Sequence, residues 1–453
     1  MSTRAREKAR SVVYVTRHAT GESLRSARAV GQLEGVRLLC ISEGPPRADA
    51  AEVFAGQARV ADVHDSAQLV AAARALDEKH GPLHQLVTAQ ETLLEAVARA
   101  GEALGLGRGL SVATVRRALD KSLLKRTLAE AGVNTARDCL ITSDEDARRF
   151  AAEVGFPFVL KPLSGSGGLA TWRIIDAAQL ERALALVRPA AERALLAEDY
   201  VRGEELCLDT ITIGGEPRLH SVCCYRPSIM EALENPRLQW SCVMPRDIGG
   251  ERYREFIEQG LAAVRALSVG DAMTHMEGFL LEGGGHCFTD ATLRPAGARI
   301  GPMLGFAYDM NPYRAWARAA VDGCFDGPWE RRYAVGTIFL RGVGAGSIER
   351  VGGVEEVKRG VGEMIVDARL PRVGAAKSAT YTGDGYVTVR HPETRAVEDA
   401  LRFIAETVEV AYSRAPSPAP AREDAGGQWS EQLQHFTRQL NKPAWEDDSL
   451  PSL

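Results

Sequence analysis

The first part of the chain alternates between short apolar runs and alanine-rich stretches. The apolar runs cover Ser11–Val15, Val36–Ser42 and Leu83–Glu91. Runs of this length predict buried strands, and the alanine-rich stretches between them predict helices. Such alternation is typical of a parallel sheet with helices on its faces, so we expect a small α/β unit that ends near residue 110. A dinucleotide site is not expected, because Thr16–Gly21 follows the first strand in place of a G-x-G-x-x-G motif.

The pattern changes from about Ser111 onward. A helical segment, DKSLLKRTLAEAGV at 120–133, precedes strands that are separated by glycine turns. Two hairpins are predicted, one about Gly214-Gly215 and one about Gly283–Gly285. A third region, Tyr333–Tyr412, is glycine-rich and short-stranded. It closes with a predicted helix whose apolar positions recur at helical spacing, namely Val397, Leu401, Ile404 and Val408.

The end of the chain has the composition of a linker followed by a short helix. The segment 415–427, APSPAPAREDAGG, is rich in proline, alanine and glycine. After it, Trp429, Leu433, Phe436 and Leu440 form one apolar stripe at helical spacing. We expect this tail to dock on its own chain or on a neighbouring subunit, and the alternative is a dedicated binding peptide.

Length, charge and cysteine content narrow the classes of function. With 453 residues, the chain exceeds one compact core, and about two to four domains are expected. Its 55 basic and 60 acidic residues leave a net charge of -5, so no general attraction to nucleic acid or anionic lipid is expected. No apolar span approaches the roughly 20 residues of a membrane helix, and the first apolar run is too short for a signal peptide. The eight cysteines show no metal-binding spacing, which predicts reduced, mostly buried thiols in a cytoplasmic protein. The charge balance leaves a small-molecule site as the expected kind of site.

A glycine-rich loop follows a predicted strand at Phe156–Trp172, which reads FPFVLKPLSGSGGLATW. Glycines let backbone N–H groups approach phosphate oxygens closely, and Lys161 at the strand end supplies a positive charge. The loop is not a Walker loop, because the lysine precedes the glycines. By itself it is compatible with a phosphate site and with an ordinary turn.

Two further segments carry acidic residues in a pattern that suits a nucleotide. Leu195–Asp209, LLAEDYVRGEELCLD, joins an apolar strand to a segment whose main chain can pair with an adenine edge and whose carboxylate can accept from ribose hydroxyls. The alternative is an exposed strand edge with solvated acids. In the second predicted hairpin, Glu277 and Asp290 fall opposite each other, where Cβ atoms lie about 5 Å apart. Two carboxylates this close repel unless a cation or a proton lies between them.

Strand periodicity places Thr292 and Arg294 on the same face as Asp290. Oxygen ligands shared with nucleotide phosphates are what Mg²⁺ prefers, so the hairpin is a candidate magnesium site. The alternative is a surface hairpin with an ion pair.

The order of these motifs resembles the ATP-grasp superfamily from about Ser111 to Trp329. The first region is similar to the Rossmann-like pre-ATP-grasp domain. The glycine-rich third region is similar to the C-terminal domain of bacterial L-amino-acid ligases, which join free amino acids into dipeptides. The resemblance implies an α/β (α+β) protein with four parts: 1–110, a Rossmann-like domain; 111–330, an ATP-grasp domain; 331–414, a C-terminal ligase-type domain; and 415–453, a linker and tail.

The resemblance also implies roles for individual residues. ATP and Mg²⁺, with Mn²⁺ as an alternative, are the implied cofactors. Glu277 and Asp290 match the metal-binding carboxylates. Arg294 matches the arginine that steadies the transferred phosphoryl group or the substrate carboxylate, and Arg294 and Lys161, which contacts the nucleotide phosphates, are the implied catalytic residues. The positions that match nucleotide-binding residues are Lys121, Lys161, Ser164, Gly165, Ser166, Gly167, Gly168, Glu198, Tyr200, Val201 and Glu205.

Asp290 and Thr292 depart from the glutamate and asparagine usual at these positions, which puts metal affinity in question. The implied activity is an ADP-forming ligase that joins a small carboxylate to an amine through an acyl phosphate, in a homodimer. The alternatives are an ATP-grasp carboxylase and a non-catalytic ATP-binding protein. The segment Tyr225–Pro245 is the expected specificity segment, in which Glu231 or Glu234 would hold an ammonium group. Arg226 or Arg299 would hold a carboxylate, and the alternative for all four charges is a solvated loop.

Overall fold

A computed structural model gives the structure of residues 10–45, 50, 52–163, 171–235, 237–344, 346–378 and 380–413. The predicted phosphate loop at Ser164–Gly168 and the predicted tail helix lie outside these residues.

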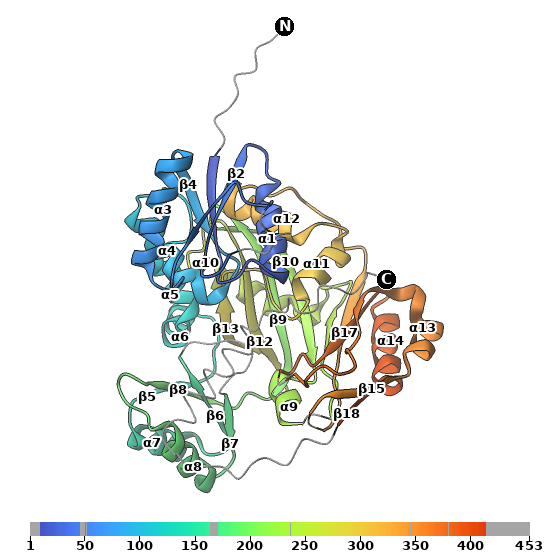
Figure 1. The fold of residues 1–453 in the computed structure, drawn as a ribbon. Coiled ribbons are helices and arrows are strands. Elements are labelled where there is room, and N and C mark those ends of the chain that lie inside the picture. The colour runs from blue at the N-terminus through green and yellow to red at the C-terminus, as the bar shows by residue number, and fades with distance from the viewer. Residues whose placement is uncertain are drawn as a thin grey trace.

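The N-terminal unit is a parallel sheet with strand order β3-β2-β1-β4 and helices on both faces (Figure 1). Side chains of β1 alternate between two cores, so that Tyr14 packs toward α1 and Val13 packs toward α3 and α4. The third predicted strand ends earlier than expected, at Val87, because Thr88 accepts a hydrogen bond from Gln90 N–H and turns the chain into a 3-10 helix. The elements are β1 (Arg10–Val15), α1 (Gly21–Gly31), β2 (Val36–Ser42), β3 (Gly56–Arg59), α3 (Ser66–His80), β4 (Leu83–Val87), η1 (Glu91–Leu93) and α4 (Leu94–Ala103).

A small antiparallel unit stands apart from the body at the lower left of Figure 1. Its strand order is β5-β8-β6-β7, and Phe150, Phe158 and Leu184 belong to a core of its own. Two helices, α5 (Val112–Leu119) and α6 (Lys121–Glu130), precede it. Its elements are β5 (Asp138–Ile141), α7 (Asp144–Val154), β6 (Phe158–Pro162), β7 (Trp172–Ile174), α8 (Ala177–Val187) and β8 (Leu195–Asp199).

The central part is a larger sheet with strand order β13-β12-β9-β10-β11-β14-β17-β16. The hairpin predicted about Gly214-Gly215 is confirmed, and both glycines have positive φ (59° and 84°), as a tight hairpin turn requires. The second predicted hairpin is confirmed as β12–β13. The elements before residue 330 are β9 (Gly203–Ile213), β10 (Glu216–Arg226), α9 (Ile229–Glu234), β11 (Ser241–Met244), α10 (Glu251–Ala266), β12 (Ala272–Leu281), β13 (His286–Thr292), α11 (Ile300–Tyr308), α12 (Pro312–Ala317) and η2 (Arg318–Asp322).

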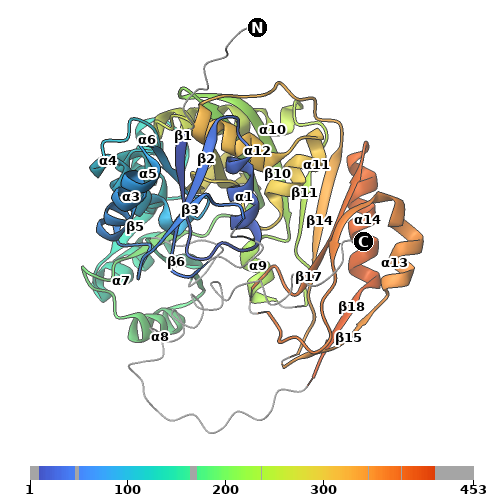
Figure 2. The ribbon, with the colours of Figure 1, turned by 45° about the horizontal axis from the view of Figure 1, so that its top comes forward.

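The chain after residue 330 adds the strands β14, β17 and β16 to one end of the central sheet. Figure 2 shows β14 and β17 beside the helices α13 and α14. The predicted helix is confirmed as α14, which packs Val397 and Leu401 on β14. A Cβ on Gly336 would lie 2.6 Å from Leu401 Cδ1, so this close approach requires a glycine. The elements are β14 (Ala334–Leu340), β15 (Ile348–Gly352), α13 (Val354–Val361), η3 (Gly362–Met364), β16 (Ile365–Arg369), β17 (Gly385–His391), α14 (Thr394–Thr407) and β18 (Glu409–Tyr412).

Among the helices that the structure describes, none combines the length and the apolar character needed to cross a membrane. All eight cysteines have free thiols; six are buried, and Cys139 and Cys324 are partly exposed.

Candidate functional site: two cavities that meet at a carboxylate pair

Two cavities meet at the hairpin β12–β13. The first, here called the lysine cavity, has a volume of about 240 Å³ and is lined by Lys121 and Lys161. The second, here called the arginine cavity, has a volume of about 220 Å³ and is lined by Arg294. Glu277 and Asp290 line both cavities. Ligands bound in the two cavities would therefore meet at these carboxylates.

Two lysines share one buried glutamate beside the lysine cavity. Nζ of Lys161 on β6 lies 2.7 Å from Glu198 Oε2, and Nζ of Lys125 on α6 lies 3.1 Å from Glu198 Oε1. Burial opposes the charge of Glu198, but the two ammonium groups hold the pKa of its carboxyl below the usual value. Lys161 lines the cavity, whereas Lys125 donates to the carbonyl of Ala136 (2.7 Å). The Glu198 side chain is thus occupied by the two lysines, and its strand β8 pairs with β5 and β6 on either side.

Lys121 is placed at the cavity by the start of α6. Asp120 caps this helix, and the N–H of Lys121 donates to the carbonyl of Leu163 (3.2 Å), directly beyond β6. Nζ of Lys121 lies 2.5 Å from Asp290 Oδ2. The helix start and the strand end thus carry both lysines to one cavity.

The connection between β8 and β9 forms another wall of the lysine cavity. Tyr200 and Val201 line it, and the guanidinium groups of Arg173 and Arg202 lie over the Tyr200 ring, 5.4 Å and 5.8 Å from its centroid. These cation–π contacts orient the tyrosine across the connection. The predicted hinge residues Tyr200 and Val201 therefore line the same cavity as the two lysines, and their contact with a base stays a prediction.

Glu205 enters the same cavity from β9. Its carboxylate accepts a hydrogen bond from the N–H of Ile229 (2.6 Å), at the start of α9. Burial and the nearby charge of Glu277 raise the pKa of Glu205 to about 8. A buried carboxylic acid of this kind is available as a hydrogen-bond partner for a hydroxyl.

Glu277 and Asp290 are confirmed as directly opposed on β12 and β13. Their repulsion is relieved by separate partners, because Lys121 binds Asp290 and the Tyr225 hydroxyl lies 3.4 Å from Glu277 Oε1. Burial opposes the ionisation of Asp290, but Lys121 and Lys161 hold its pKa below the usual value. The carboxylate of Asp290 therefore keeps its charge beside the Glu277 side chain.

This set of donor atoms fits a hard divalent cation. Besides the two carboxylates, Thr292 lines the arginine cavity, and its hydroxyl is buried without a hydrogen-bond partner among the described residues. Mg²⁺ prefers oxygen ligands of this kind. Glu277 and Asp290 would hold the cation, with Thr292 as a nearby third oxygen, and a bound cation would neutralise phosphate charge.

Arg294 lines the arginine cavity just beyond β13. Its guanidinium lies 2.7 Å from Glu91 Oε2 and donates to the carbonyl of Pro295 (2.8 Å). Glu91 comes from the N-terminal unit, so this ion pair joins segments 203 residues apart. An anionic ligand of Arg294 would exchange with the Glu91 carboxylate.

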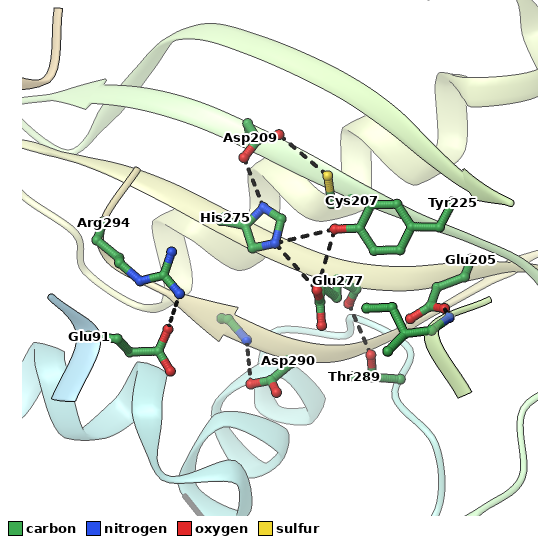
Figure 3. A network of polar contacts seen from close by, with 12 residues as sticks. Glu91, Glu205, Cys207, Asp209, Tyr225, His275, Glu277, Thr289, Asp290 and Arg294 are labelled. Carbon is green, nitrogen blue, oxygen red and sulfur yellow. Dashed lines mark hydrogen bonds and ion pairs between the residues drawn. The ribbon is translucent and has the colours of Figure 1, made fainter. Parts of the chain in front are cut away.

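A polar network connects the arginine cavity to the interior of the sheet (Figure 3). Nδ1 of His275 on β12 lies 2.9 Å from Asp209 Oδ1 on β9, and its Nε2 lies 3.4 Å from both Glu277 Oε1 and the Tyr225 hydroxyl. Cys207 Sγ also reaches Asp209 (3.4 Å). Because Asp209 fixes the ring of His275, the other ring nitrogen is held toward Glu277 and the cavity.

The two acids predicted to hold an ammonium group have other roles. Glu231 forms a capping box with Ser228 at the start of α9 and lines the lysine cavity. Glu234 lies 2.5 Å from Arg173 of β7, on the small antiparallel unit. Neither acid is among the described residues that line the arginine cavity, and their contact with a substrate ammonium group stays a prediction.

The two arginines predicted to hold a carboxylate are also engaged elsewhere. Arg226 lies 2.6 Å from Glu398 of α14, and Arg299 pairs with Asp367 of β16. The described residues that line the arginine cavity include neither arginine. The predicted specificity segment nevertheless contributes Tyr225 and Leu233 to this cavity.

Comparisons with known proteins agree on one fold. Residues 120–204 match the sequence profile of the ATP-binding domain of the carbamoyl-phosphate synthase L chain. An L-amino acid ligase from Bacillus licheniformis superposes with a TM-score of 0.71 at 18% identity, covering 90% of this chain and 100% of that one. N5-carboxyaminoimidazole ribonucleotide synthetase from Thermotoga maritima gives a TM-score of 0.64 at 17% identity, with coverage of 89% and 100%.

The chain has the ATP-grasp fold. The fold that the sequence resemblance implied is thereby confirmed. In sequence, this ATP-grasp chain is 24% identical over 314 residues to a formate-dependent phosphoribosylglycinamide formyltransferase of Bacteroides fragilis, covering 67% of this chain and 78% of that protein.

Several residues around the two cavities were missed by reasoning from the sequence. Lys125 carries a usable signal, since it lies four residues after Lys121 on the same helix and therefore on the same face. Asp209 lies four residues after Glu205 on β9, and the strand period of two therefore places both side chains on one face. Glu91 and Tyr381 carry no such signal, because only the tertiary fold brings them to the arginine cavity.

Proposed function

We propose that this ATP-grasp protein is an ADP-forming carboxylate–amine ligase that uses Mg-ATP. The observation that carries the proposal is the pair of cavities that meet at Glu277 and Asp290. One cavity supplies two lysines for phosphate, and the other supplies Arg294 for an anion. A phosphoryl donor and an acid acceptor would therefore meet at the carboxylates that suit magnesium.

The reaction follows from these parts. A substrate carboxylate oxygen attacks the γ-phosphorus of ATP, and the bond to the bridging oxygen breaks to release ADP. An amine then attacks the acyl phosphate, phosphate leaves, and the ammonium proton is released as the amide forms. Phosphoryl transfer depends on positioning and charge neutralisation more than on a nucleophilic side chain, which suits Lys121, Lys161 and Arg294. Similarity to an L-amino acid ligase supports amino acids or related small acids as substrates.

The test is a substrate-pair screen with purified protein and Mg-ATP, in which ADP release is measured and products are identified by mass spectrometry. We expect ADP and phosphate only when a suitable acid and amine are both present. Release of AMP, or no turnover with any pair, would count against the ligase. A third outcome, ATP binding by calorimetry without turnover, would favour a non-catalytic ATP-binding protein.

A carboxylase is the second candidate, because several similar structures are N5-carboxyaminoimidazole ribonucleotide synthetases. Bicarbonate-dependent ADP release without any other acid would identify that activity. The arginine cavity argues for a larger acid, since its volume of about 220 Å³ exceeds what bicarbonate occupies. The screen therefore includes bicarbonate as one acid.

A further inference from the structure

A loop that follows β16 brings a tyrosine into the arginine cavity from the C-terminal region. We propose that Tyr381 is a specificity-determining residue that sets the size of the acid side chain which this cavity accepts. The inference rests on the proposed ligase function. It adds that the enzyme selects the acid by the size of its side chain. Neither the motifs in the sequence nor the matched profile at residues 120–204 includes this residue.

The loop that carries Tyr381 is anchored on both sides. Asp384 accepts a hydrogen bond from the N–H of Ser378 (2.7 Å) and another from the hydroxyl of Tyr412, while its own N–H donates to the carbonyl of Leu340 (3.0 Å). Gly383 has a φ of 60°, and a Cβ there would lie 2.5 Å from the Leu340 carbonyl oxygen. The backbone on either side of Tyr381 is thus fixed against β14.

The side chain of Tyr381 is held by aromatic packing. Its ring meets Trp240 edge-to-face with centroids 4.7 Å apart, and Tyr225 meets the same indole edge-to-face at 5.3 Å. Trp240 is fully buried and also packs on Phe339 (5.0 Å). Aromatic pairs in this geometry contribute beyond their buried area, so both tyrosines form rigid walls rather than adaptable ones.

The lining of the arginine cavity divides by chemistry. Its ionisable residues, apart from the tyrosines, are those of the site described above: Glu91, His275, Glu277, Asp290 and Arg294. The remaining lining carries no charge and consists of three threonines (Thr292, Thr380 and Thr382) and seven apolar or aromatic residues, namely Tyr225, Leu233, Ala291, Gly297, Ala298, Ile300 and Tyr381. Such walls offer no partner to a second charge, so the ligand class is an acid with an uncharged aliphatic or aromatic side chain.

The size of the cavity agrees with that class. A cavity of roughly 150 Å³ accepts benzene, and the arginine cavity has a volume of about 220 Å³. The carboxylate and a compact side chain of the acid substrate therefore fill the arginine cavity. Removing the Tyr381 ring enlarges the space, while removing only its hydroxyl leaves the wall in place.

The test compares Tyr381→Ala and Tyr381→Phe with the wild type, using L-alanine and L-phenylalanine as the acid, saturating Mg-ATP and an amine found active in the screen. We expect Tyr381→Ala to raise the ratio of kcat/KM for phenylalanine over alanine by about tenfold or more. Tyr381→Phe should keep this ratio within about twofold, and the KM for ATP should stay unchanged in both. Tyr333→Ala is the matched control, since Tyr333 packs on Arg390 (4.4 Å) and does not line the arginine cavity among the described residues.

A ratio that stays constant in Tyr381→Ala, or a uniform loss of kcat with both acids, would overturn the inference. If the wild type releases no ADP with any acid, the ligase proposal fails separately. Calorimetry with the same two acids and a non-hydrolysable ATP analogue then decides the question for Tyr381, because a changed ratio of dissociation constants supports it. An unchanged ratio, or no binding of either acid, contradicts it.

Discussion

Lys161 and Lys125 bind the same carboxylate, but only Lys161 faces the lysine cavity, so they form a matched pair for testing the proposed phosphate contact. We consider Lys161→Met and Lys125→Met, because methionine keeps most of the aliphatic stem and removes the charge. If Lys161 contacts phosphate, Lys161→Met should weaken ATP binding as well as stability. Lys125→Met should lower stability alone.

The expected stability loss follows from the shared glutamate. Breaking a buried ion pair by removing one partner costs about 3–5 kcal/mol. Since one lysine remains beside Glu198 in each variant, roughly half of that, about 2 kcal/mol, is expected for either substitution. Lys125→Met should lose about 1 kcal/mol more, because the buried carbonyl of Ala136 is left without its donor.

The expected effect on ATP is different for the two variants. A charge-assisted hydrogen bond to phosphate contributes about 1.5–3 kcal/mol, so Lys161→Met should raise the Kd for ATP by about 10-fold to 150-fold. Lys125→Met should leave that Kd within about twofold. Urea unfolding measures the first quantity, and calorimetry with a non-hydrolysable ATP analogue measures the second. The assignment would be refuted if the wild type and Lys161→Met bound ATP with equal affinity. It would also be refuted if Lys161→Met and Lys125→Met lost equal ATP affinity.

Three other predictions use single substitutions. The pKa of Glu205 is about 8 in the folded chain against an ordinary 4.5, so the folded state retains a proton that the unfolded state has released, and stability falls as the pH rises through this window. Glu205→Gln should therefore reduce the loss of unfolding free energy between pH 5 and pH 8 by about 3 kcal/mol in urea titrations; an unchanged pH dependence would contradict this. Glu277→Gln should raise the Mg²⁺ concentration for half-maximal ADP release by at least about tenfold, and an unchanged magnesium titration would remove Glu277 from the metal site. Gly336→Ala should lower the stability by about 1–3 kcal/mol through overpacking against Leu401, with thermal unfolding as the measurement, and a variant as stable as the wild type would contradict it.

The parts of the site that were predictable from the sequence are those governed by local periodicity. A strand has a period of two and a glycine turn sets the register, so counting residues away from the turn predicted that Glu277 and Asp290 lie opposite each other. The structure has this opposition, but a β-bulge between Glu277 and Gly278, which the count did not include, shifts the register by one residue to produce it. The apolar run that forms β8 ends at Asp199, and β9 begins at Gly203. Tyr200 therefore lies in the connection between the two strands, and Glu205 lies near the start of β9.

The parts that could not be predicted are contacts between distant segments. Arg294 pairs with Glu91 across 203 residues, and Arg226 pairs with Glu398 across 172. Local patterns give a charge and a face but no partner, so the pairing of Arg226 with Glu398 could not be predicted. Tyr381 reaches the arginine cavity only because the strands after residue 330 extend the central sheet.

Each cation of the proposed site is neutralised by a carboxylate of the chain itself: Lys161 by Glu198, Lys121 by Asp290 and Arg294 by Glu91. This arrangement avoids the large cost of burying unpaired charge. It also means that an anionic ligand must displace a carboxylate of the chain from the lysine or arginine that it binds. When Lys121 turns to a phosphate, Asp290 loses its cation while Glu277 lies opposite it, and the two carboxylates then repel.

Nucleotide and metal binding should therefore be coupled through Lys121. We expect Mg²⁺ to tighten binding of a non-hydrolysable ATP analogue by more than about tenfold in the wild type, because a divalent cation restores the charge that Asp290 loses. In Asp290→Asn the same lysine starts without its carboxylate, so the analogue should bind better without metal than it does in the wild type. The gain from Mg²⁺ should shrink in that variant. Calorimetry with and without Mg²⁺ measures both effects, and an equal gain in the two proteins would show that Asp290 does not couple the sites.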